Sequence, residues 1–159
     1  MSNMEPSEGL LEHAWRYFEL HANQRMSLFN YFLVLSGAVA AGLAATLQGS
    51  QRFSSLGVAL GLLLALVSFV FWKLDQRVSF LIKHAESALS ELEKTIPAES
   101  ARLFSLEPSR AKTAAEAASW WSRHWTYSKA FRFVFLVLGL FGIAGAVLSL
   151  LKCFGVMSW

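Results

Sequence analysis

Three long runs without a charged side chain constrain the fold of this chain more than any other feature. The first lies between Arg25 and Arg52, the second between Arg52 and Lys73, and the third between Arg132 and Lys152. Their apolar parts approach or reach the roughly 20 residues that a helix needs to cross a bilayer. Backbone amides in hydrocarbon must be bonded within the segment, and no strand-length alternation indicates a barrel. We therefore predict three transmembrane helices.

Composition argues against the alternative of a soluble bundle with three buried helices. Apolar residues make up 55% of the 159 residues, and charged residues make up 16%. A soluble domain has about 25% charged residues, which cover its surface. A single cysteine, Cys153, excludes an intrachain disulfide and a multi-cysteine metal site. We expect an all-α membrane protein and not a typical soluble enzyme.

Hydrophobic periodicity and helix breakers divide the chain into segments of one domain, 1–159. An amphipathic helix leads directly into the first span, over 7–47. The second span continues as a cytoplasmic helix, over 55–96, and Pro97 ends it. A cytoplasmic helical linker over 97–119 and a third transmembrane helix over 120–152 complete the order. The extension of the second span has coiled-coil spacing at Leu74, Val78, Leu81, Ala85, Leu89, Leu92 and Ile96.

The positions of lysine and arginine predict the orientation. Only Arg52 and Lys152, out of fourteen basic residues, lie on one side of the predicted spans. By the positive-inside rule, the N-terminus and the central segment are cytoplasmic and the C-terminus is outside. All eleven acidic residues lie on the cytoplasmic side with the other twelve basic ones, which leaves a net charge of +1 there. The formal charge of +3 is therefore no basic patch, and we do not expect nucleic acid binding.

Polar side chains gather at the predicted cytoplasmic ends of the first two spans. We call them the polar girdle: His21, Gln24, Arg25, Asn30, Asp75 and Arg77. The girdle is either the mouth of a pore or gate, or a clamp that holds the two helices together. For Asp75 and Arg25 we favour an ion pair of the clamp, since such pairs are common at a low-dielectric boundary.

Small residues recur along the second and third spans, and such residues let helix backbones approach closely in lipid. The candidates are Gly57, Gly61, Gly139, Gly142 and Gly145. With only three spans in the chain, we expect some of these glycines to pack against another copy. Packing within the chain alone is the alternative.

Signals for an enzyme are weak. Arg77 and His84 fit the Arg-x4-6-His spacing of the HEPN ribonucleases, but this spacing occurs by chance in many helices. The histidines have no cysteine or carboxylate constellation, so we expect no metal, cofactor or catalytic residue. No Asp, Glu, Lys or Arg lies inside a span, which leaves an ion-coupled transporter without a candidate site.

Two stretches carry a resemblance to a known family. The sequence FELHANQRMSLFNYFLV over 18–34, followed by FWKLDQR over 71–77 and the helix through Glu93, resembles the RipA family of small bacterial inner-membrane proteins. The resemblance implies a homo-oligomeric ring, an octamer, similar to the pore-forming accessory protein of type VI-B CRISPR systems. It further implies that the membrane part permeabilises the inner membrane during antiphage defence.

Two functions from different classes remain open. The first is an oligomeric inner-membrane effector or pore, whose partners are further copies of the chain and membrane lipid. The second is a scaffolding membrane protein whose cytoplasmic helices dock a soluble partner. A HEPN-like ribonuclease is a distant third.

Overall fold

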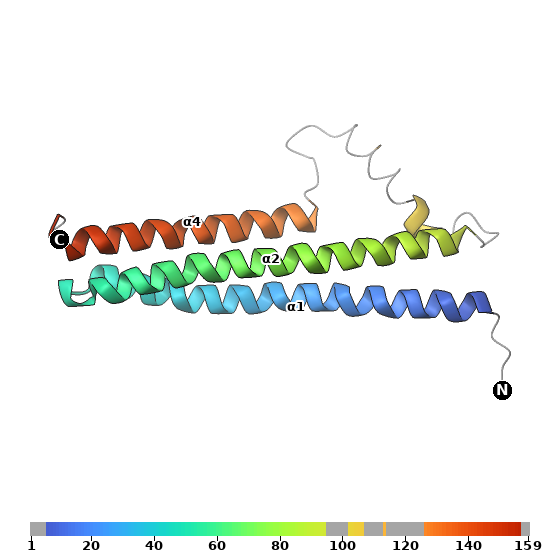
Figure 1. Ribbon diagram of the computed structural model, residues 1–159, viewed down its shortest axis with the longest axis horizontal. Coiled ribbons are helices and arrows are strands. Elements are labelled where there is room, and N and C mark those ends of the chain that lie inside the picture. The colour runs from blue at the N-terminus through green and yellow to red at the C-terminus, as the bar shows by residue number, and fades with distance from the viewer. Residues whose placement is uncertain (1–5, 95–101, 107–112, 114–125, 157–159) are drawn as a thin grey trace. The chain divides into compact units, whose positions relative to one another are not determined.

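The structure, a computed structural model, describes residues 6–94, 102–106, 113 and 126–156. Helix α1 spans Pro6–Gln48 and helix α2 spans Ser54–Glu93, with a short 3₁₀ helix, η1, over Gln51–Phe53 between them (Figure 1). Helix α4 spans Tyr127–Cys153, and residues 103–106 form one further helical turn. No strand occurs among the described residues, which confirms the predicted all-α class.

All three long helices are long and apolar enough to cross a membrane, as predicted. Helices α1 and α2 contain 43 and 40 residues, and α4 contains 27. At a rise of 1.5 Å per residue, α1 and α2 are about 65 and 60 Å long, roughly twice the 30 Å hydrocarbon core of a bilayer. Both helices therefore continue well beyond their spans, as the amphipathic patterns predicted.

The ends of two helices differ from the predicted bounds. Helix α2 ends at Glu93, and the amide of Lys94 donates to the Glu91 carbonyl at 3.2 Å in a closing turn. Pro97 disfavours a helical conformation just before it, which fits this early end. Helix α4 begins at Tyr127, whereas the predicted third span begins at residue 120. Thr126, directly before the helix, is not helical. Threonine is a favoured residue before the first turn of a helix.

Several predicted boundaries lie outside the described residues. These are Ile96, Pro97, most of the linker 97–119, and residues 120–125. The described chain divides into two compact units, the first containing residues 1–25 and 77–126 and the second containing 26–76 and 127–159. Helices α1 and α2 contribute to both, and the single domain stays a prediction. The two units are described separately below.

Phenylalanines form the core at one end of the second unit, where α1, α2 and α4 meet. Phe29 stacks on Phe131 with ring centroids 3.9 Å apart and the planes 5° from parallel. Phe32, which is fully buried, contacts Phe135 edge to face at 4.6 Å and Phe71 at 5.4 Å. Such edge and stacked contacts add stability beyond the area that they bury. The cluster therefore ties the third span to the first two.

Glycines permit the closest approach of helices in the second unit. A Cβ atom on Gly61 would lie 2.6 Å from both the Ala146 nitrogen and the Gly142 oxygen. A Cβ atom on Gly142 would in turn lie 2.7 Å from the Gly61 oxygen. The backbones of α2 and α4 thus touch at a point that admits no side chain.

The other three predicted glycines also pack within the chain. A Cβ atom on Gly57 would collide with the Ser149 hydroxyl, one on Gly145 with Leu43, and one on Gly139 would touch Ser68 at 3.4 Å. All five glycines thus pack against other helices of the same chain. Contacts of the glycines with another copy stay a prediction.

One face of α2 is buried in the first unit. Val78, Ile82, Ala85 and Leu89 are between 2% and 9% exposed, whereas Leu81 is only half-buried. The predicted seam is therefore correct at Val78, Ala85 and Leu89. It is wrong at Leu74, which is 38% exposed, and at Leu81, where Ile82 takes the inner position, while Leu92 is half-buried. A straight helix has 3.6 residues per turn, so its buried face drifts relative to a strict seven-residue repeat.

Candidate functional site

Two members of the polar girdle are brought together by the structure. The His21 Nδ1 and Gln24 Oε1 atoms form a hydrogen bond of 3.2 Å, one turn apart on α1. The ring of Tyr17 meets the His21 ring edge to face, with centroids 4.4 Å apart. The histidine is thus oriented by neighbours from its own helix.

The remaining members of the girdle differ in exposure and belong to different units. Asp75 is buried, with 4% of its surface exposed, while Asn30 and Arg77 are exposed and Arg25 is half-buried. Asn30 and Asp75 belong to the second unit, and the other four members belong to the first. A continuous girdle and the Arg25–Asp75 pair stay predictions.

Lys152 makes a polar contact that we did not predict. Its Nζ atom donates to the carbonyl oxygens of Leu47 and Gly49, both at 2.7 Å, and the residue is only 5% exposed. Carbonyls at the C-terminal end of a helix have no partner within the helix and attract a cation. Close by, the Gln51 side chain donates to the Cys153 carbonyl at 3.2 Å. The lone basic residue that ends the third charge-free run was the available signal for this contact.

Glu93 holds a short helical turn in the first unit. Its carboxylate accepts hydrogen bonds from the amides of Phe104 and Ser105, at 3.1 and 2.9 Å, and from the Ser105 hydroxyl at 3.2 Å. Phe104 in turn meets the rings of Phe18 and Trp15, with centroids 5.3 and 6.1 Å away. The sequence around Glu93 gives no signal for this contact, because Phe104 and Ser105 lie on the far side of Pro97 in the chain.

The environment of Glu93 also changes its acidity. Burial alone would raise its pKa, but the hydrogen bonds from Phe104 and Ser105 favour the charged carboxylate and outweigh burial, so the pKa lies below its ordinary value of 4.5. The residue lies some twenty positions beyond Lys73, which ends the charge-free part of α2. Glu93 therefore acts as an ionised cap at neutral pH.

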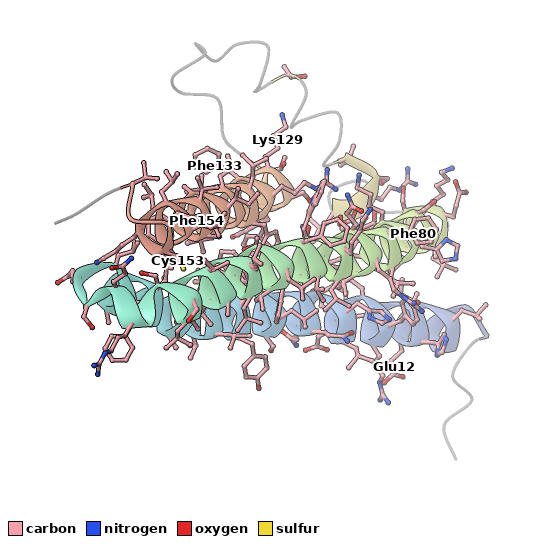
Figure 2. The ribbon with its side chains drawn as sticks, turned by 60° about the vertical axis from the view of Figure 1, so that its left-hand side comes forward. Glu12, Phe80, Lys129, Phe133, Cys153 and Phe154 are labelled. Carbon is pink, nitrogen blue, oxygen red and sulfur yellow. The ribbon has the colours of Figure 1, made fainter. Side chains whose placement is uncertain are left out.

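Large apolar side chains remain exposed along the spans. Phe133 on α4 is 53% exposed, and Figure 2 shows its side chain above the ribbon. Phe154, just beyond the end of α4, is 76% exposed. In the most apolar part of each long helix, only 22% to 28% of the residues are buried. Exposed apolar surface of this extent must meet lipid or other protein.

The residues of the weak enzymatic signal lie on the surface of one helix. Arg77 and His84 are both exposed on α2. Among the residues that the structure describes, no three His, Cys, Asp or Glu side chains lie close enough to hold a metal ion.

Comparison with known proteins gives the context for this geometry. CD-NTase-associated protein 19 from Escherichia coli is 43% identical over 136 residues, which cover 86% of this chain and 87% of that protein. No solved structure matches the chain. The RipA name and the link to type VI-B CRISPR systems stay predictions. The model of the octameric membrane protein family matches residues 8–151, which include almost all of α1, α2 and α4, and this chain with its three membrane-length helices belongs to that family.

Proposed function

We propose that the chain assembles as an octamer in the bacterial inner membrane and perturbs that membrane during antiphage defence. The observation that carries the proposal is the exposed apolar surface of all three spans, in a chain whose family is described as octameric. The name of the Escherichia coli relative associates that protein with a CD-NTase, which supports a place in a defence system.

The charge distribution supports the orientation that we propose. The N-terminus and the central segment lie in the cytoplasm and the C-terminus lies outside, because only Arg52 and Lys152 flank the spans on the outer side. The octamer forms a ring of the kind that the RipA resemblance implies, and its pore opens between copies. The polar girdle then lies at the cytoplasmic mouth.

Membrane potential in living cells tests the effector function. Cells that express the chain are loaded with a potential-sensitive dye and infected with phage, and we expect depolarisation that empty-vector cells lack. Gly61→Leu is the matched inactive variant, because the contact of α2 with α4 leaves no room for a side chain at that position. An unchanged potential in cells that contain the assembled wild-type protein contradicts the proposal.

The girdle has a separate test. We expect Arg25→Asp and Asp75→Arg each to reduce the amount of assembled protein, and the double reversal to restore it. If the double variant does not restore the amount of assembled protein, the Arg25–Asp75 pair is rejected. The other girdle residues are tested separately, by Asn30→Leu and Gln24→Leu in the depolarisation assay.

A second function, docking of a soluble partner, is favoured by one observation. Apolar side chains outside the charge-free runs remain exposed in the first unit: Leu10, Leu20, Phe80 and Leu103 are between 58% and 69% exposed. The scaffold function is supported if the membrane potential stays intact and a soluble partner binds the wild-type protein but not Leu20→Ser or Phe80→Ser. RNA degradation that requires both Arg77 and His84 would instead support the ribonuclease.

A further inference from the structure

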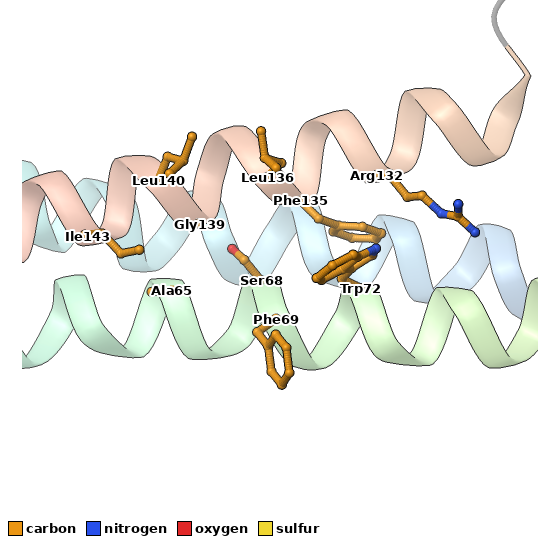
Figure 3. Close-up of a pocket in the computed structure, with 10 residues that line it drawn as sticks. All are labelled: Ala65, Ser68, Phe69, Trp72, Arg132, Phe135, Leu136, Gly139, Leu140 and Ile143. Atoms are coloured by element: carbon orange, nitrogen blue, oxygen red, sulfur yellow. The ribbon is translucent and has the colours of Figure 1, made fainter.

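A groove opens between α2 and α4 in the second unit (Figure 3). Its volume is about 250 Å³, and small residues, Ala65, Ser68 and Gly139, line its floor. Leu136 and Leu140 stand on its rim and are 60% and 57% exposed. The groove stays open because the residues of its floor are small and those of its rim are bulky.

The interior of the groove is almost entirely apolar. The hydroxyl of Ser68 already donates to the Leu64 carbonyl at 2.8 Å. Phe69, Phe135 and Ile143 complete an apolar lining together with the rim. Because a polar ligand buried here would lose its hydrogen bonds to water, the groove suits a hydrocarbon chain.

One basic side chain lines an end of the groove, and a second lies beside an aromatic ring of its wall. Arg132 lines that end, and Figure 3 shows its side chain beyond Trp72 and Phe135, at the end far from Ile143. The Lys73 Nζ atom lies 5.5 Å from the centroid of the Trp72 ring, which is itself part of the wall. In the sequence, Lys73 and Arg132 also bound charge-free runs, so this end lies where the spans meet the membrane surface.

We propose that the groove binds one acyl chain of an anionic phospholipid, whose phosphate group lies beside Arg132 and Lys73. From Arg132 to Ile143 the helix rises by about 16 Å, which matches half of the roughly 30 Å hydrocarbon core and hence one leaflet. Basic side chains at the membrane surface attract anionic lipid headgroups. The site does not depend on the proposed depolarising function.

A helix of a second copy is the competing occupant. Such a helix would lie over the groove and insert only single side chains into it. The basic side chain of Arg132 at one end favours the lipid, because a phosphate group would pair with it whereas an apolar helix face would not.

Lipid binding to the purified full-length assembly tests the proposal. In native mass spectrometry with phosphatidylglycerol and phosphatidylcholine of identical chains, we expect preferential binding of phosphatidylglycerol. Arg132→Gln weakens that binding about fivefold, the factor that corresponds to one basic residue at the membrane surface. Ala65→Phe fills the floor and removes binding of both lipids. Arg52→Gln, at the opposite end of the spans, is the matched control and binds as wild type does.

Three results overturn the site. They are equal binding of the two lipids by wild type, unchanged binding in Arg132→Gln, and efficient crosslinking between copies through Leu140→Cys in a Cys153→Ser background. The last result places a second copy in the groove. If Ala65→Phe does not assemble, Arg132→Gln, which replaces an exposed side chain, decides the question.

Discussion

Gly61→Ala tests the contact between the backbones of α2 and α4. The added methyl group would lie 2.6 Å from two backbone atoms, whereas ordinary van der Waals contact begins at 3.4 Å. The two helices must therefore separate locally by the difference, about 0.8 Å, and overpacking of this kind costs about 1–3 kcal/mol. Alanine is a better helix former than glycine, and this opposing effect must be removed from the comparison.

Gly37→Ala on α1 is the control, because a Cβ atom there meets nothing within 4 Å. Both variants gain the same helix propensity, so their difference isolates the contact. Reversible unfolding in mixed micelles, titrated with a denaturing detergent, should show Gly61→Ala less stable by about 1–3 kcal/mol, roughly 5- to 150-fold in the unfolding equilibrium. Equal unfolding constants for the two variants would refute the close approach.

Three further predictions use contacts of single side chains. Lys152→Met leaves two part-buried carbonyls without their donor and should cost about 1–3 kcal/mol in the same titration, whereas Lys152→Arg should cost less. Glu93→Gln should release residues 102–106, measured as faster hydrogen exchange at their amides. Because the pKa of Glu93 is lowered in the folded protein, its stabilisation is complete above pH 4.5 and is lost as the pH falls through the folded value, so wild type should show the same release in acid. Phe32→Ala should cost about 3–5 kcal/mol, against little for the exposed Phe133→Ala.

The sequence predicted the spans well because the charge-free runs are a property of each helix alone. The same holds for the length of α1 and α2, whose amphipathic patterns continue beyond the membrane. At Leu81 the prediction failed by one residue, since a heptad and a straight helix do not have the same period. The helix bounds near Glu93 and Tyr127 depend on turns at single residues, which periodicity does not resolve.

Contacts between distant segments were beyond the reach of the sequence. Glycine spacing indicates that two backbones come close, but it does not say whether the partner helix belongs to the same chain. Glu93 looks like an ordinary surface charge in the sequence, and Lys152 stands out only as the basic residue that ends a charge-free run; only the tertiary structure brings amides or carbonyls to them. The groove beside Arg132 arises from small residues on two helices, and no motif in either helix marks it.

The meeting of Gly61 with Gly142 also limits how the protein can change its conformation. The backbones touch at a point that admits no side chain, so sliding or rotating either helix would drive a neighbouring side chain into the other backbone. We therefore expect α2 and α4 to move as one rigid body within the second unit. Opening and closing of an assembly would then occur by tilting of whole subunits against one another, with no hinge between these two helices.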